Sequence, residues 1–204
     1  MAYVGPQRAL QSVVSLFQTG DDPTLLPATC QSVEAELSLS GGMFNPSYFQ
    51  YALAPADFVP TGWYLIEVLE GETTFDGQTN LYNSWYTGAP TPLMSQTEVR
   101  VRMSSRSPLQ LLSMQDFFAY HRCLTIAATR VLRSNPTLND LTGFIQFSKL
   151  ERLERLEDDA YASTDTQRRV LRSQLTLSVQ MLEAATGEGV GGGANLPPVY
   201  LPNF

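Results

Sequence analysis

The chain has 204 residues, of which 43% are hydrophobic, and this is enough to bury the core of one domain. Its 13 basic and 20 acidic residues give a formal net charge of −7, which does not suggest a surface that binds nucleic acid by neutralising phosphates. Neither a run of about 18 apolar residues nor a signal-peptide pattern occurs. We therefore expect a soluble protein, made in a reducing cytoplasm and not inserted in a membrane.

Two segments in the first quarter of the chain show periodic apolar residues. Pro6 near a helix start, apolar residues at helical spacing and Gly20 at the end predict a short amphipathic helix over residues 6–20. In residues 32–42, Val33, Ala35, Leu37 and Leu39 alternate with polar residues, which predicts a first strand. A proline- and aromatic-rich connector is expected over residues 41–61.

The middle of the chain predicts strands followed by the longest helix. Residues 63–69 are apolar on both faces, as in a central strand, and Asp76-Gly77 is a turn signal that indicates a hairpin or flap. Residues 95–105 alternate, with Val99, Val101 and Met103 inward and Arg100 and Arg102 outward. Ser107, Pro108 and Gln110 then form a capping box, which predicts a helix to about residue 134.

The last part of the chain predicts a long β-hairpin over residues 141–182. Residues 141–150 suit a strand, whereas "ERLERLEDD" that follows is compatible with a short helix or an extended hairpin arm. The final strand is predicted by alternating apolar residues from 171 to 181. Asp158, Asp159 and Asp165 are expected at the tip of this hairpin.

Together these elements predict an α+β fold: a mainly antiparallel sheet with helices packed on one face, a long β-hairpin and an extended C-terminal arm. Residues 1–186 form a single domain with an aromatic and proline-rich insertion at about 41–92. Residues 187–204 combine glycines with a proline-rich end, which is typical of a tethered arm.

The sequence offers little chemistry. His121 is the only histidine, so most catalytic triads and His-based metal sites are excluded, and we expect a structural role for it. No phosphate-binding, dinucleotide or nucleophile-elbow motif occurs. Cys30 and Cys123 show no ligand spacing and are expected to be buried free thiols. The acidic clusters lack the spacing of a calcium loop. We therefore predict no catalytic residue, no metal and no cofactor.

Contacts with partners are the better expectation. The crowded aromatic residues of the insertion either fill the core of the domain or form a surface for partners. The interface residues predicted from the pattern are Leu175, Leu177 and Val179 on the last strand, Arg100 and Arg102 on the earlier one, and Tyr200 and Phe204 as anchors of the arm.

The layout resembles a known family. The outward-polar strand "EVRVRMSS" leads directly into the helix "SPLQLLSMQDFFAYHRCLTIAATRVL", and the strands "LTGFIQF" and "RRVLRSQLTLSVQ" follow. Over roughly residues 90–182 this pattern is similar to the tail-terminator and tail-completion proteins of tailed bacteriophages. The long insertion and the glycine-rich extension are additions to that family's core.

The resemblance implies a structural protein of the virion neck. Its subunits would form a ring, commonly a hexamer, that terminates the tail tube and joins it to the head connector, with DNA passing only passively and without cofactor or catalysis. Two alternatives remain: a head-tail connector or adaptor, although those are usually helical, and a small soluble enzyme or ligand-binding domain that uses the aromatic region as a pocket.

Overall fold

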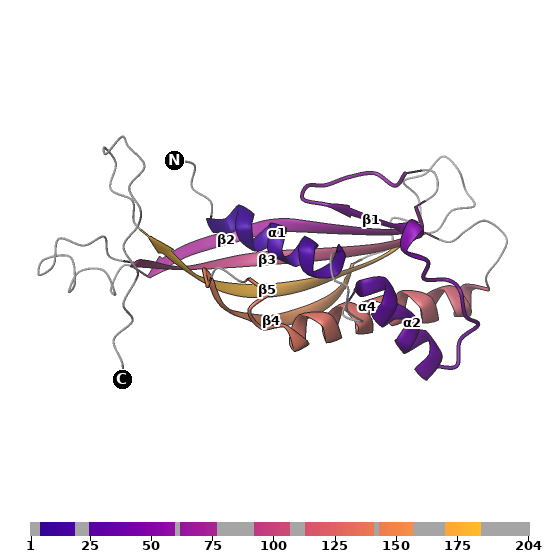
Figure 1. Cartoon of the computed structure of the whole chain (residues 1–204). Coiled ribbons are helices and arrows are strands. Elements are labelled where there is room, and N and C mark those ends of the chain that lie inside the picture. Colours follow the sequence, from indigo (N-terminus) through magenta and orange to yellow (C-terminus); the bar gives the residue numbers. More distant parts are fainter. Residues whose placement is uncertain are drawn as a thin grey trace, which may run out of the picture.

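The computed structural model describes residues 5–18, 25–59, 62–76, 92–106, 113–140, 143–156 and 170–184. These residues form one mixed sheet with three α-helices, which confirms the α+β class. In Figure 1 the long strands run along the molecule, and α1, α2 and α4 lie on one side of them. The C-terminal arm, with Tyr200 and Phe204, and the predicted hairpin tip lie outside the described residues.

The sheet has the strand order β1-β2-β3-β5-β4. Its strands are β1 (Phe49–Ala52), β2 (Tyr64–Asp76), β3 (Pro92–Arg106), β4 (Ile145–Leu156) and β5 (Val170–Ala184). β1 pairs with β2 in parallel, and the other neighbours are antiparallel. The predicted β-hairpin is confirmed as β4 and β5. The extended alternative for "ERLERL" is also confirmed, because β4 continues to Leu156.

Two of the helices correspond to helices predicted from the sequence. α1 (Gly5–Gln18) is the predicted N-terminal helix. α4 (Met114–Ser134) begins after Ser113, whose Oγ accepts a 3.1 Å hydrogen bond from the backbone N–H of Asp116. The helix predicted to run from Ser107 to about residue 134 is wrong in its start, because Ser113 is extended and is itself the N-cap of α4. Ser107 lies outside the described residues.

The strand predicted around Val33 is wrong, because α2 (Leu26–Glu36) occupies that part of the chain. Leu26, Cys30 and Val33 fall at the helical spacing of four and three residues and are fully buried. Leu37 caps the helix and is exposed, and Ser38 has a positive φ of 54°. The alternating pattern thus extends over a helix end and a turn, and it does not follow the core.

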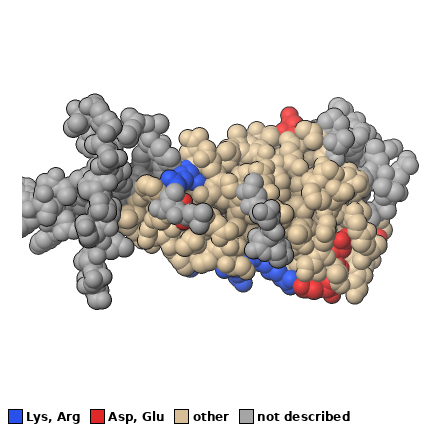
Figure 2. All heavy atoms as spheres, viewed as in Figure 1, with Lys and Arg blue, Asp and Glu red and all other residues tan. Residues whose placement is uncertain are grey.

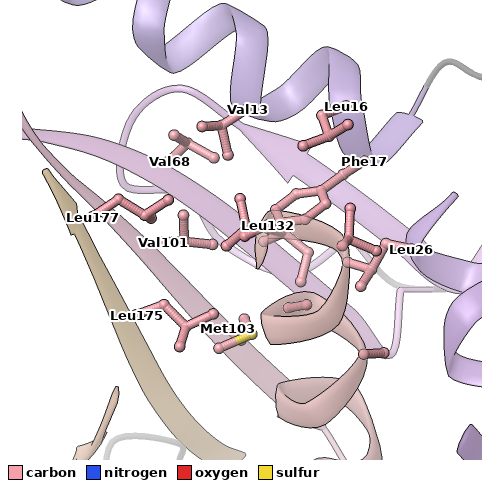
Figure 3. Close-up of a cluster of buried hydrophobic side chains, with 14 of the residues drawn as sticks. Val13, Leu16, Phe17, Leu26, Val68, Val101, Met103, Leu132, Leu175 and Leu177 are labelled. Atoms are coloured by element: carbon pink, nitrogen blue, oxygen red, sulfur yellow. The ribbon is translucent and has the colours of Figure 1, made fainter. Parts of the chain in front are cut away.

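The core lies between the helices and one face of the sheet. Figure 3 shows Val13 and Phe17 of α1 directed toward Val68 and Val101 of the sheet, with Leu132 of α4 close by. All of these side chains are buried. Burial of a side chain of this size contributes about 1.5–3 kcal/mol each, so this single layer is the main source of stability.

Candidate interaction surface

The two faces of the sheet differ sharply in composition. On β3, Val99, Val101 and Met103 point into the core beneath the helices, and the intervening Arg100 and Arg102 lie on the opposite face. We call this second face, which none of the three described helices covers, the open face. The inward and outward assignments predicted for β3 agree with this arrangement.

Strand register aligns the open face into rows of polar side chains. One row joins Glu67, Arg102, Gln174 and Glu154 across four strands. The next row joins the polar residues Arg100, Thr176 and Arg152 and ends at the apolar Leu69 on β2. Further along the strands, Gln96 donates a 2.6 Å hydrogen bond to Ser178 Oγ. The open face is therefore a broad polar surface with both signs of charge.

Most charges of the open face are paired within the chain. Arg100 pairs with Glu98 on β3, and Arg152 Nη2 lies 3.0 Å from a carboxylate oxygen of Glu154 on β4. These pairs are exposed, so each contributes little to stability and is readily exchanged for a pair with another molecule.

Arg102 and Glu67 form a more buried pair. Their closest nitrogen and oxygen atoms are 3.9 Å apart, and the Glu67 side chain is only 6% exposed. The other carboxylate oxygen of Glu67 accepts a 3.0 Å hydrogen bond from the backbone N–H of Ala56. Nε of Arg102 is buried without a hydrogen-bond partner among the described residues. Arg102 thus neutralises a buried carboxylate as well as contributing to the open face.

A hollow of about 550 Å³ lies on the open face. Its wall comes from β2, β3, β4 and β5, and its charges are those of Glu72, Glu98, Glu151 and Arg152. Among the described residues no group of histidine, cysteine, aspartate and glutamate side chains is arranged to hold a metal ion.

The predicted interface residues on β5 need correction. The side chains of Leu175, Leu177 and Val179 are at most 1% exposed and belong to the core of the chain itself. They therefore have no surface with which to contact a partner in this conformation. Alternation correctly identified their face as buried, but it does not distinguish burial beneath a helix of the same chain from burial against another subunit.

His121 lies on the opposite side of the sheet from Arg100 and Arg102. On α4, its Nδ1 is 2.7 Å from Ser105 Oγ of β3, and its Nε2 is 2.9 Å from Ser173 Oγ of β5. Burial, with a smaller contribution from the positive charge of Arg155, lowers the pKa of His121 from 6.5 to about 4. A neutral imidazole with both nitrogens engaged suits the structural role predicted for it, which remains a prediction.

Both cysteines are free and buried, as predicted. Cys123 Sγ donates a 3.2 Å hydrogen bond to the carbonyl oxygen of Cys30, which joins α4 to α2. Burial raises the pKa of Cys123 to about 12 and also raises the pKa of Cys30. Both groups are therefore protonated thiols, which are poor nucleophiles.

The described aromatic residues of the insertion largely pack on one another. The Phe44 ring is fully buried and stacks on Tyr64 with centroids 5.0 Å apart. Tyr48 and Trp63 are stacked at 4.0 Å. Of the two interpretations left open for these residues, a structural role fits this packing. The remaining aromatics of residues 77–91 lie outside the described part of the chain.

None of the described helices is both long and apolar enough to cross a membrane. Figure 2 shows that uncharged residues form most of the described surface on the side it presents, with a few charged groups toward the margins.

No protein-family model matches the chain, and no curated protein matches it. Among solved structures, it is similar to the sheath/tube terminator of an extracellular contractile injection system, PVC, in the extended state. The identity is 9% and the TM-score is 0.38, and the match covers 100% of this chain and 65% of that chain.

Proposed function

We propose that this chain is a structural subunit of a tail-like particle. Copies assemble into a ring, of the hexameric kind that the sequence resemblance implies, which terminates a tail tube and joins it to a head connector. The chain performs no catalysis and needs no cofactor. It is made in the host cytoplasm and resides in the neck of the virion, where DNA passes through the ring without specific contact.

The open face of the sheet is the observation that carries this proposal. Arg100 and Arg152 lie in one row across four strands, each beside an acidic partner, on a surface that the three described helices leave uncovered. Arginine is enriched at contacts between proteins, where its planar guanidinium group pairs with carboxylates by two hydrogen bonds. A catalytic site instead needs polar groups that converge on a reacting atom.

The placement of the titratable groups supports a non-catalytic role. His121 is held by two serines beneath α4, and the described cysteines are protonated and buried. None of these groups lies among the residues that line the hollow on the open face. His121 and the two cysteines are therefore separated from this hollow by the sheet.

The order of elements gives further support. β3 and β5 are long neighbouring strands, and α4 lies between β3 and β4 in the chain. This is the succession of strand, long helix and two strands on which the resemblance to tail terminators rests.

Tube assembly tests the proposal directly. Purified chain added to polymerising tail-tube protein from the same particle should bind tube ends and limit tube length, as measured by electron microscopy. Arg100→Glu reverses an exposed charge on the open face and should weaken this effect, whereas Arg133→Glu on α4 should not. Tubes of unchanged length with the unmodified chain would contradict the proposal.

A further inference from the structure

Among the described residues β4 pairs with a single strand, β5, which makes it an edge strand of the described sheet. Figure 1 shows it at the margin of the sheet, on the side of α4. An edge strand presents unpaired backbone N–H and C=O groups, which are a template for pairing with another strand.

The preceding connector covers only the first part of that edge. The N–H of Ser148 donates a 2.6 Å hydrogen bond to the carbonyl oxygen of Pro136, and the N–H of Ile145 donates to the carboxylate of Asp140 at 2.9 Å. Neither contact involves a residue beyond Ser148. Within the described part of the chain, the edge beyond these two contacts begins at Lys149 and includes the segment up to Glu154.

This available edge is self-complementary when two copies run antiparallel. In the segment "KLERLE", a register centred between Glu151 and Arg152 places these two residues opposite each other. The same register places Lys149 opposite Glu154 and Leu150 opposite Leu153. Each charge thus meets its opposite, and each leucine meets a leucine.

A β-bulge makes this register geometrically consistent. Residues that face each other across a two-fold axis perpendicular to the sheet must lie on the same face of their own strand. Lys149 pairs with Ser178 and Glu154 pairs with Gln174, and these partners are four residues apart on β5, so both lie on one face. In a regular strand Lys149 and Glu154 would lie on opposite faces, because they are an odd number of residues apart. The β-bulge between Leu150 and Arg152 adds one residue, Glu151, and thereby places them on the same face.

The isolated chain leaves these groups available. Leu153 is the most exposed of the large hydrophobic side chains described, at 52%. Lys149 pairs with Glu151 at 3.1 Å and Arg152 with Glu154 at 3.0 Å, but both pairs are exposed and weak. Charges of a single sign would keep edges apart, whereas alternating charges in this order attract a second copy.

We infer that the free edge of β4 binds the β4 edge of a second copy of this chain, antiparallel and about a two-fold axis. The two sheets then continue into one, with the helices of both copies on the same side. A two-fold contact pairs subunits and does not close a ring, so it is a different contact from that of the proposed ring, although Arg152 borders both surfaces. Its register rests on β4 alone and does not depend on the proposed function.

Charge variants of the full chain test this register. Lys149→Glu with Arg152→Glu gives an acidic edge, and Glu151→Lys with Glu154→Lys gives a basic edge. Each variant alone should lose the two-fold contact, because like charges face each other across it. Mixing the two variants should restore an assembly of the wild-type mass, as measured by sedimentation velocity.

Matched controls separate this effect from net charge and from misfolding. Arg122→Glu with Arg133→Glu makes the same change in net charge as the acidic edge variant, but at exposed positions of α4. It should leave the assembly unchanged. Circular dichroism should show that every variant is folded. The inference is overturned if either edge variant alone assembles like the wild type, or if the mixture stays dissociated.

Cross-linking checks the register itself. Chains carrying Leu150→Cys mixed with chains carrying Leu153→Cys should form covalent dimers on mild oxidation, because these positions are opposite each other. Either variant alone should cross-link much less, and the native cysteines are buried. Leu37→Cys, at an exposed position just after α2, is the control. If this variant cross-linked equally well, the dimers would arise from random collision, and the register would be contradicted.

Discussion

Ser105 Oγ lies 2.7 Å from Nδ1 of His121, and this buried contact joins β3 to α4. The hydroxyl and the imidazole satisfy each other in a region where an unpaired polar group costs about 1–3 kcal/mol. The pair explains how the only histidine of the chain is accommodated next to an apolar core.

The low pKa of His121 predicts a stability that depends on pH. Since the folded pKa of about 4 is below the ordinary 6.5, the unfolded chain binds the proton first as the pH falls. The free energy of unfolding should therefore decrease between pH 6.5 and 4, by up to ~3 kcal/mol from this group. His121→Gln should cost about 1–2 kcal/mol at pH 7 and reduce this pH dependence, as measured by urea unfolding. An unchanged pH dependence in the variant would contradict this assignment, and loss of function with the fold intact would contradict a structural role.

Leu177 is predicted to be essential for folding of the subunit itself. Leu177→Asp places a charge in a position that is 1% exposed and should cost several kcal/mol, on the order of 4–5. Gln180→Asp on the same strand, at an exposed position, is the matched control and should remain folded. Normal thermal unfolding of Leu177→Asp would show that this face is not the core.

Arg100 and Arg102 should differ in their effects on stability, although they are equivalent in the alternating pattern. Arg102→Ala removes the cation that pairs with the nearly buried Glu67 carboxylate, and it should lower the free energy of unfolding by about 1–3 kcal/mol. Arg100→Ala removes an exposed pair and should change stability by about 0.5 kcal/mol or less. Urea unfolding of both variants checks this, and Glu67→Gln should recover part of the loss in Arg102→Ala. Equal losses in the two single variants would rule out the buried pair.

The C-terminal arm, outside the described residues, is predicted to dock on a neighbouring subunit or neck protein. Deletion of residues 187–204 should leave the melting temperature of the core unchanged but weaken assembly, because a proline-restricted segment loses little entropy on docking. Tyr200→Ala with Phe204→Ala should reproduce the defect, whereas Asn195→Ala with Asn203→Ala should not. If the truncated chain assembles and joins its partner as well as the full chain, the arm is dispensable.

Periodicity predicted the sheet well, because β3 and β5 each have one face in the core and one face in solvent. It failed at Val33, where two residues of a helix and two of the following turn happen to alternate. It also left "ERLERL" undecided, because leucines three residues apart fit neither regular period. The β-bulge at Glu151 places Leu150 and Leu153 on the same face, whereas Leu156, opposite Arg172, lies on the other face.

The candidate site was less predictable than the fold. Alternation places Arg100 and Arg102 on one face, but the burial of Glu67 beneath Arg102 depends on pairing between strands that are far apart in sequence. The contacts of His121 have the same origin, because Ser105 and Ser173 come from β3 and β5. Sequence patterns report the face of a residue and not its partners across the sheet.

Imaging of the purified full chain tests the central claim most directly. Negative-stain electron microscopy, with the mass measured by light scattering, should show closed rings whose mass is a whole multiple of the subunit mass. Arg100→Glu should reduce the fraction of rings while the subunit stays folded. A monomer at all concentrations, with saturable binding of a small ligand, would contradict the structural role and favour a binding domain.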